Sequence, residues 1–233
     1  GRMVKPTFAF LLLKEHPYGR EMLKQLLSAD FIPTIIIEED STIADEEREK
    51  FLKRIEGKPI APEIVIQVRN FDIPLVKVPI HSSEYVMPHI NGIELDLIVF
   101  GGTRIIRGDI LDFPKDGVVN SHPGLLPDCR GSASPAWSVY HDIPIGSTTH
   151  FCYNGIDTGD LLLRREFPVK RGMPYDDDNQ RHADSTAPVL RVVRNRPVPD
   201  QPALPSRQGP VHGRGRGCQA LRGVQGTEDS GVP

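Results

Sequence analysis

The sequence predicts an α/β fold built on a doubly wound, mostly parallel sheet. Mostly apolar stretches with the length of a strand recur at 7–13, 32–40, 74–80 and 95–102. Stretches with the apolar spacing of a helix lie between them. Strands that are apolar on consecutive positions are typical of parallel sheets buried on both faces, and repeated strand–helix units produce such sheets. A Rossmann-like arrangement of strands and helices is therefore expected.

The first strand–helix unit begins with TFAFLLL at 7–13, a continuous apolar run of buried-strand length. YGREMLKQLLSAD at 18–30 follows it. The apolar side chains of this second stretch lie on one face of a helix, namely Met22, Leu23, Leu26 and Leu27. We therefore expect a buried strand followed by an amphipathic helix.

The second unit has the same form. IPTIIIEED at 32–40 predicts the second strand. DEEREKFLKRI at 45–55 predicts a helix, because acidic residues occupy its first turn and basic residues lie toward its end, where they complement the helix dipole. We expect Phe51, Leu52 and Ile55 to face inward.

The remaining parallel elements are shorter. PLVKVPI at 74–80 predicts a third strand, and SSEYVMPHIN at 82–91 predicts a short helix limited by its proline. LDLIVFGG at 95–102 predicts a fourth strand that ends in two glycines. GVVN predicts one more strand, which ends at Asn120. These strands would complete the parallel part of the sheet.

An antiparallel end of the sheet is predicted from GSTTHFCYNGIDTGDLLLRREFPV at 146–169. The residues alternate up to Cys152, turn through Asn154 and Gly155, and resume as a second strand in DLLLRREF. Asp157 lies on the loop between these two strands.

Composition limits the class of protein. The 233 residues, 38% of them apolar, are enough for one globular domain with a sizeable core. A net charge of −3 gives no basic excess of the kind that nucleic-acid binding usually needs. The three cysteines are widely spaced, which suits a reducing compartment. Neither a signal peptide nor an apolar run of about 18 residues is visible. We expect a cytoplasmic protein without a membrane segment; its oligomeric state is not predicted.

A break in composition divides the chain into a domain at 4–175 and a tail at 176–233. Every Phe, Ile, Tyr, Met, Trp and Lys lies at or before residue 175. The tail is rich in Pro, Arg and Gly and has no strand or helix period, so we expect it to be disordered. Two origins fit this composition. One is a natural Pro/Arg-rich tail, and the other is a shifted reading frame after about Tyr175, which would leave the domain incomplete at its C-terminal end.

Polar side chains at the end of the GVVN strand form the main candidate site. Asn120 and His122 come at this end, and Pro123 and Pro127 follow in a segment that cannot be helical. In doubly wound sheets, ligands bind beyond the carboxyl ends of the strands, near the switch point of strand order. Together with Asp157, an amide, an imidazole and a carboxylate could supply an oxyanion donor, a proton acceptor and an orienting base. The residues alone leave turn formation as an alternative role.

Other polar residues and glycines have plainer interpretations. His141 and His150 lack compact ligand spacing with the candidate site, so no metal site is predicted. Gly101 and Gly102 are too few for a phosphate-binding fingerprint, and they most simply end a strand. Arg130 could bind a phosphate or sugar of an acceptor, or it could form a structural ion pair.

Two longer motifs occur together at 120–137 and 146–163. NSHPGLLPDCRGSASPAW contains Asn-x-His-Pro-Gly-Leu-Leu-Pro and then Arg-Gly, and GSTTHFCYNGIDTGDLLL contains Gly-Ile-Asp-Thr-Gly. This pair resembles the signature of the folate-dependent formyltransferase family, and the resemblance covers roughly residues 4–175. It implies the formyltransferase fold, an N-formylating enzyme of one-carbon metabolism, and 10-formyltetrahydrofolate as the formyl donor, with no metal.

The resemblance also implies roles for individual residues. Asn120, His122 and Asp157 would be the catalytic amide, imidazole and carboxylate, with Arg130 as a contact to the acceptor. Asn120 would donate to the oxyanion, His122 would assist there and in proton transfer, and Asp157 would orient or charge-stabilise the imidazole or hold a relay water. Backbone of two loops would line the donor site: Gly101, Gly102, Thr103, Arg104, Ile105 and Ile106 in one, and Asn154, Gly155, Ile156 and Thr158 in the other. Thr103 departs from the family, where a larger apolar or aromatic residue often follows the glycine.

The identity of the amine acceptor is left open by the sequence. Relatives that formylate a purine-pathway ribonucleotide have a glycine-rich loop after the first strand, whereas this chain has KEHPYG at 14–19. Relatives that act on initiator methionyl-tRNA carry a further C-terminal barrel, which the composition of the tail does not predict. We expect a small amine such as an amino sugar nucleotide, with aminoacyl-tRNA less favoured. Hydrolysis of formyl-folate is one alternative, and a folate-binding or inactive remnant is another.

Overall fold

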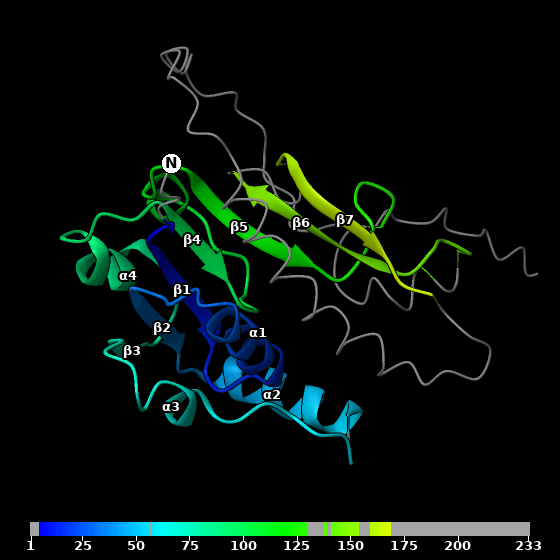
Figure 1. Cartoon of the computed structure of the whole chain (residues 1–233), viewed down its shortest axis with the longest axis horizontal. Coiled ribbons are helices and arrows are strands. Elements are labelled where there is room, and N and C mark those ends of the chain that lie inside the picture. The colour runs from blue at the N-terminus through cyan, green and yellow to red at the C-terminus, as the bar shows by residue number, and fades with distance from the viewer. Residues whose placement is uncertain (1–4, 56, 130–137, 139–140, 154–158, 169–233) are drawn as a thin grey trace, which may run out of the picture.

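A sheet of seven strands organises the described part of the chain, which comprises residues 5–55, 57–129, 138, 141–153 and 159–168 of this computed structural model (Figure 1). The strands are β1 (Phe8–Leu13), β2 (Ile35–Glu39), β3 (Leu75–Val78), β4 (Leu97–Phe100), β5 (Gly117–His122), β6 (Gly146–Cys152) and β7 (Leu161–Glu166). Their order across the sheet is β3-β2-β1-β4-β5-β6-β7. Strands β1 to β5 pair in parallel, and β6 is antiparallel to both β5 and β7. The predicted fold class is confirmed.

Helices cover this sheet. They are α1 (Pro17–Ser28), α2 (Thr42–Arg54), α3 (Ile64–Gln67), α4 (Ser83–Ile90) and the 3₁₀ helix η1 (Asp109–Asp112). The first two helices begin at side-chain caps, because the His16 ring accepts from the backbone N–H of Tyr18 and the Ser41 hydroxyl accepts from that of Ala44. No helix in the described ranges is long and apolar enough to cross a bilayer.

The core has two apolar layers because successive side chains of a strand point to opposite faces of the sheet. On β1, Phe10 packs in the cluster that contains Leu23 of α1, whereas Leu11 packs in the cluster that contains Val86 of α4. All six residues of β1 are buried, as a central strand of a doubly wound sheet requires. The carboxyl ends of the parallel strands are therefore fixed from both sides.

The structure corrects several predicted element details. Strand β5 does not end at Asn120, because Ser121 and His122 continue the ladder opposite Thr149 and Thr148 of β6. Pro88 lies inside α4 instead of ending it.

The second helix also differs from its prediction. It begins at Thr42, and of the three side chains expected to face inward only Ile55 is buried, while Phe51 and Leu52 are half-buried. Ser41 caps this earlier start, which explains why the acidic residues alone placed the helix too late. The predictions for the tail at 176–233 lie outside the described residues.

Leu23→Ala should destabilise the protein, because Leu23 is fully buried between α1 and the sheet. We expect the free energy of unfolding to fall by about 2–5 kcal/mol in urea titrations. Leu27→Ala on the same helix is the matched control, since Leu27 is only half-buried and its loss should cost clearly less. Equal losses in the two variants would contradict the described packing.

Candidate active site

Asn120 lies next to His150 across the β5–β6 pairing. The two residues are direct partners in the ladder, and Asn120 Nδ2 is 3.5 Å from His150 Nε2. His150 is fully buried, and its Nδ1 lies 2.9 Å from the carbonyl oxygen of Phe151. A carbonyl only accepts, so Nδ1 of His150 donates to Phe151 O. The amide nitrogen of Asn120 is the side-chain atom that faces Nε2.

His122 points into the protein. It is 5% exposed, and its Nε2 lies 2.9 Å from the carbonyl oxygen of Cys129. Since the carbonyl accepts, Nε2 of His122 carries the proton and donates it to this contact. His122 is the last residue of β5, two residues beyond the predicted end of the strand, and its ring is not displayed to solvent. Any proton that the neutral ring accepts would have to arrive at Nδ1.

Hydroxyl groups of β6 hold the segment after β5. Thr148 Oγ1 accepts from the backbone N–H of Leu126 at 2.9 Å and donates to the carbonyl of Gly124 at 2.8 Å. The hydroxyls of Ser121 and Thr149 lie 3.0 Å apart. Thr148 and Thr149 are buried, and sequence reasoning assigned them no role at the site. The run of four polar residues at 147–150 within a strand was the available signal, because hydroxyls buried on a strand need partners.

Several predicted site residues lie outside the described residues. They are the proposed catalytic carboxylate and its loop, Asp157 with Asn154, Gly155, Ile156 and Thr158, and the proposed acceptor contact Arg130. Beyond them, Asp160 O accepts from Phe151 N at 3.0 Å, so Asp160 lies against β6 one residue after His150.

The loop after β4 runs over the carboxyl end of β1. Gly101 N donates to Leu11 O at 2.7 Å, and Leu13 N donates to Gly102 O at 2.8 Å. A Cβ on Gly101 would lie 2.2 Å from the Phe10 ring, so glycine is required for this close approach. Gly102 has φ +88°, a conformation that favours glycine. The two glycines thus turn the chain across the switch point between β1 and β4.

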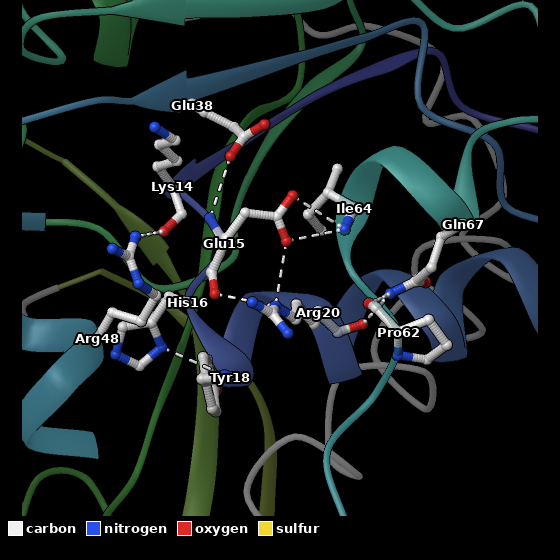
Figure 2. Close-up of polar contacts among 10 residues, drawn as sticks. All are labelled: Lys14, Glu15, His16, Tyr18, Arg20, Glu38, Arg48, Pro62, Ile64 and Gln67. Atoms are coloured by element: carbon white, nitrogen blue, oxygen red, sulfur yellow. Dashed lines mark hydrogen bonds and ion pairs between the residues drawn. The ribbon is translucent and has the colours of Figure 1, made fainter. Parts of the chain in front are cut away.

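The loop between β1 and α1 is held by bonds within the protein (Figure 2). The backbone N–H of Lys14 donates to Glu39 O, that of Glu15 to Glu38 Oε2, and that of His16 to Leu13 O. Tyr18 N donates to the His16 ring, and residue 17 is a proline without an N–H. Every backbone donor at 14–18 is therefore already used.

Carboxylates and arginines surround the same loop (Figure 2). The Glu15 carboxylate accepts from Ile64 N at 3.0 Å and lies 3.1 Å from Arg20 Nε, which ties α3 to this loop. Glu15 itself has φ 51°, which is unusual for a residue with a side chain. Arg48 reaches across from α2 and donates to Lys14 O at 3.0 Å.

Two titratable groups in or beside this loop have shifted pKa values: Glu38, which is fully buried, and His16, which is half-buried. Burial, followed by the Glu15 carboxylate, raises the pKa of Glu38 to about 7. Burial lowers the pKa of His16 to about 4, against the attraction of Glu47. Both groups are thus held neutral near pH 6 by desolvation. Sequence reasoning missed Glu38 and Glu39, which looked like the polar end of an apolar strand but are both fully or almost fully buried.

No group of three or more His, Cys, Asp or Glu side chains in the described ranges is arranged to hold a metal ion.

Comparisons with known proteins identify the family. A protein-family model described as formyl transferase matches residues 42–192, which is more than half of the chain, and the chain therefore belongs to the formyl transferase family. Among similar proteins, the methionyl-tRNA formyltransferase of Syntrophus aciditrophicus is 32% identical over 151 residues, which cover 61% of this chain and 48% of that protein. The methionyl-tRNA formyltransferase of Clostridium acetobutylicum is 36% identical over 124 residues, covering 50% and 39% respectively. The chain thus spans about half the length of these relatives, or less.

Solved structures share the fold. Glycinamide ribonucleotide transformylase 1 from Symbiobacterium toebii has a TM-score of 0.60 at 18% identity, and the match covers 82% of this chain and 86% of that chain. A formyltetrahydrofolate deformylase from Pseudomonas syringae also has a TM-score of 0.60, at 16% identity, covering 82% and 61%. At these identities the similarity concerns the fold.

Glu38→Gln should change how stability depends on pH. The folded protein holds a proton on Glu38 more tightly than the unfolded chain does, so this contribution is fully present below the unfolded pKa of about 4.5 and is lost as the pH rises through about 7. Between pH 5 and pH 8 we expect the group to cost the wild type about 1–3 kcal/mol of unfolding free energy. Glu38→Gln should remove this loss in urea titrations at a series of pH values.

The exposed carboxyl of Asp72 provides the control for this experiment. Asp72→Asn should keep the pH dependence of the wild type. If Glu38→Gln kept it as well, Glu38 would not be the group that titrates near neutral pH.

Proposed function

We propose that the chain transfers the formyl group of 10-formyltetrahydrofolate to an amine. Membership of the formyl transferase family supports this proposal. The observation that carries it is the pairing of Asn120 with His150 at the carboxyl end of β5, two residues before His122. The Asn120 amide and the His122 imidazole therefore lie at the edge of the sheet where ligands of doubly wound folds bind.

The proposed reaction needs an oxyanion donor and a route for one proton. The amine nitrogen forms a bond to the formyl carbon, and the bond from that carbon to N10 of the folate breaks. The proton that the amine loses ends on the folate nitrogen. One N–H of Asn120 faces His150, so the second would donate to the oxygen on which negative charge develops. His122 would take part through Nδ1, because Nε2 donates to Cys129 O.

Asp157 completes the proposed catalytic group. Its roles would be to stabilise the charged form of His122 or to hold a water that relays the proton. The backbone at 101–106 and 154–158 would bind the donor, and Arg130 would contact the acceptor. No role is proposed for a metal.

The loop after β1 bears on the acceptor. Phosphate groups are bound by free backbone N–H groups, commonly at glycine-rich turns that open a helix. Here the donors at 14–18 are all bonded within the protein, and the Glu15 and Glu38 carboxyls lie beside them. A ribonucleotide phosphate would therefore find no free backbone N–H at 14–18.

Two amine acceptors follow from the remaining observations. The sequence relatives named methionyl-tRNA formyltransferase favour an aminoacyl-tRNA. The residues of the two sequence motifs also fit an amino sugar nucleotide. Hydrolysis of the donor by water is the second candidate reaction, because a structure with this fold is named formyltetrahydrofolate deformylase. Incubating the full chain with the donor, with each amine in turn and with none, separates these reactions by their formylated product or by formate.

Asn120→Ala, His122→Ala and Asp157→Ala should each lower turnover by about 100-fold to 1,000-fold, because each removes a group that acts on one tetrahedral intermediate. Binding of the donor should change little. The effects should not add in double variants, because once one member of a catalytic unit is removed the others can contribute little. Steady-state kinetics with the preferred acceptor and equilibrium binding of the donor give the two measurements.

His141→Ala is the matched control, because His141 is an exposed imidazole that belongs to neither β5 nor β6. It should keep near-normal turnover. An Asp157→Ala variant with near-normal turnover would overturn the proposed role of the carboxylate, and loss of activity on chelation would overturn a metal-free reaction.

A further inference from the structure

Arg104 forms a two-pronged ion pair with Glu39. Arg104 Nε donates to Glu39 Oε2 at 2.9 Å, and Arg104 Nη2 donates to Glu39 Oε1 at 2.8 Å. The two nitrogens of the planar guanidinium thus meet the two oxygens of the carboxylate, which is the strongest geometry for such a pair. Glu39 ends β2, whereas Arg104 follows β4, so the pair joins elements that lie on either side of β1.

Glu39 is a fixed anchor for this pair. Its side chain is 1% exposed, and its oxygens also accept from Ser41 Oγ at 3.0 Å and from His81 N at 3.2 Å. His81 is fixed in turn because its Nε2 donates to Ile37 O at 2.9 Å. Burial opposes the charge of the carboxylate, but the bonds from Arg104, His81 and Ser41 together hold the pKa of Glu39 below its ordinary value. A buried carboxylate with four donors cannot move without losing them.

Arg104 belongs to the loop at 101–106 that crosses the end of β1. Gly101 and Gly102 bond to β1 at one end of the loop, and the Arg104 side chain is held by β2 further along it. Ile106 is buried beyond Arg104, whereas Ile105 between them is 53% exposed. An apolar side chain is therefore presented to the outside by a segment that is fixed on both of its sides.

We propose that Arg104 and Glu39 act as a clamp that positions the loop at 101–106 for the formyl donor. In this assignment Arg104 is a positioning residue. The Arg104 guanidinium is paired with Glu39, so Arg104 holds the loop backbone and Ile105 in place and does not bind the carboxylates of the folate. The part of the inference that concerns the donor rests on the proposed function, whereas the ordering of the loop does not.

Amide hydrogen exchange of the full chain without ligand tests the clamp itself. Glu39→Gln and Arg104→Gln should each speed exchange of the amides at 103–106 by about tenfold or more, because local opening no longer breaks the ion pair. Asp40→Asn is the matched control. Asp40 follows Glu39 and pairs with Lys14 at 3.0 Å in a more exposed position, so its loss should leave these amides unchanged. Unchanged exchange in Glu39→Gln and Arg104→Gln would overturn the clamp.

Binding of 10-formyltetrahydrofolate distinguishes positioning from direct contact. If the clamp positions the loop, Glu39→Gln and Arg104→Gln should weaken donor binding by a similar factor of about ten, and the double variant should be no weaker. The KM for the donor should rise by this factor, while kcat and the KM for the acceptor should change by less than about threefold. If Arg104 instead contacts the donor, freeing it in Glu39→Gln should preserve or tighten binding, and only Arg104→Gln should weaken it. That second pattern would overturn the proposal.

A folding defect would not hide the result. Glu39→Gln leaves a guanidinium that is one-third exposed, and Arg104→Gln leaves a carboxylate that keeps its bonds to Ser41 and His81. Arg104→Lys is the milder variant, because it keeps the charge but loses the fork, and it should show the same direction with a smaller effect. A wild type that binds no donor would refute the proposed function, and the exchange experiment alone would then decide the clamp.

Discussion

The antiparallel pairing of β5 with β6 is the constraint on which the candidate site depends. The parallel strands β1 to β5 all have their carboxyl ends at the same edge of the sheet. In the described part of the chain, β5 is the strand among them that also pairs with an antiparallel neighbour, β6. This pairing sets His150 opposite Asn120 and Thr148 opposite His122. The His150 ring faces the amide nitrogen of Asn120, and the Thr148 hydroxyl accepts from Leu126 N in the segment after the strand. Polar side chains at a strand end thus become a fixed arrangement.

Two loops at the same edge of the sheet are held in different ways, the loop after β1 through its backbone N–H groups and the loop after β4 through glycines and an arginine side chain. The loop after β1 spends its N–H groups on Glu38, Glu39 and Leu13, and it is closed to an anion. The loop after β4 is fixed by two glycines and by the Arg104 side chain, which leaves Ile105 exposed. Fixing a loop from below through side chains leaves its outer surface available for a ligand. We infer that the second loop, and not the first, faces the folate.

The sequence was sufficient to predict the seven strands, because long apolar stretches indicate burial on both faces of a sheet. The helix at Ile64–Gln67 was missed, since four residues are too few for a period and its capping carboxylate comes from Glu15, 49 residues away. The positions of Asn120 and His122 were predicted from the end of an apolar strand. The contact of His122 with Cys129 O was not, because it depends on how the following segment folds back. Burial of Glu39 likewise depends on Arg104, 65 residues away.

The central claim is that the carboxyl end of β5 is the binding site of a formyl-folate. A crystal structure of the protein with bound tetrahydrofolate tests this most directly. We expect the pterin against the backbone at 101–106 and N10 of the folate within hydrogen-bond reach of the Asn120 amide or the His122 ring, with Arg104 still paired to Glu39. Folate bound at any other face of the sheet, or N10 turned away from both Asn120 and His122, would contradict the claim.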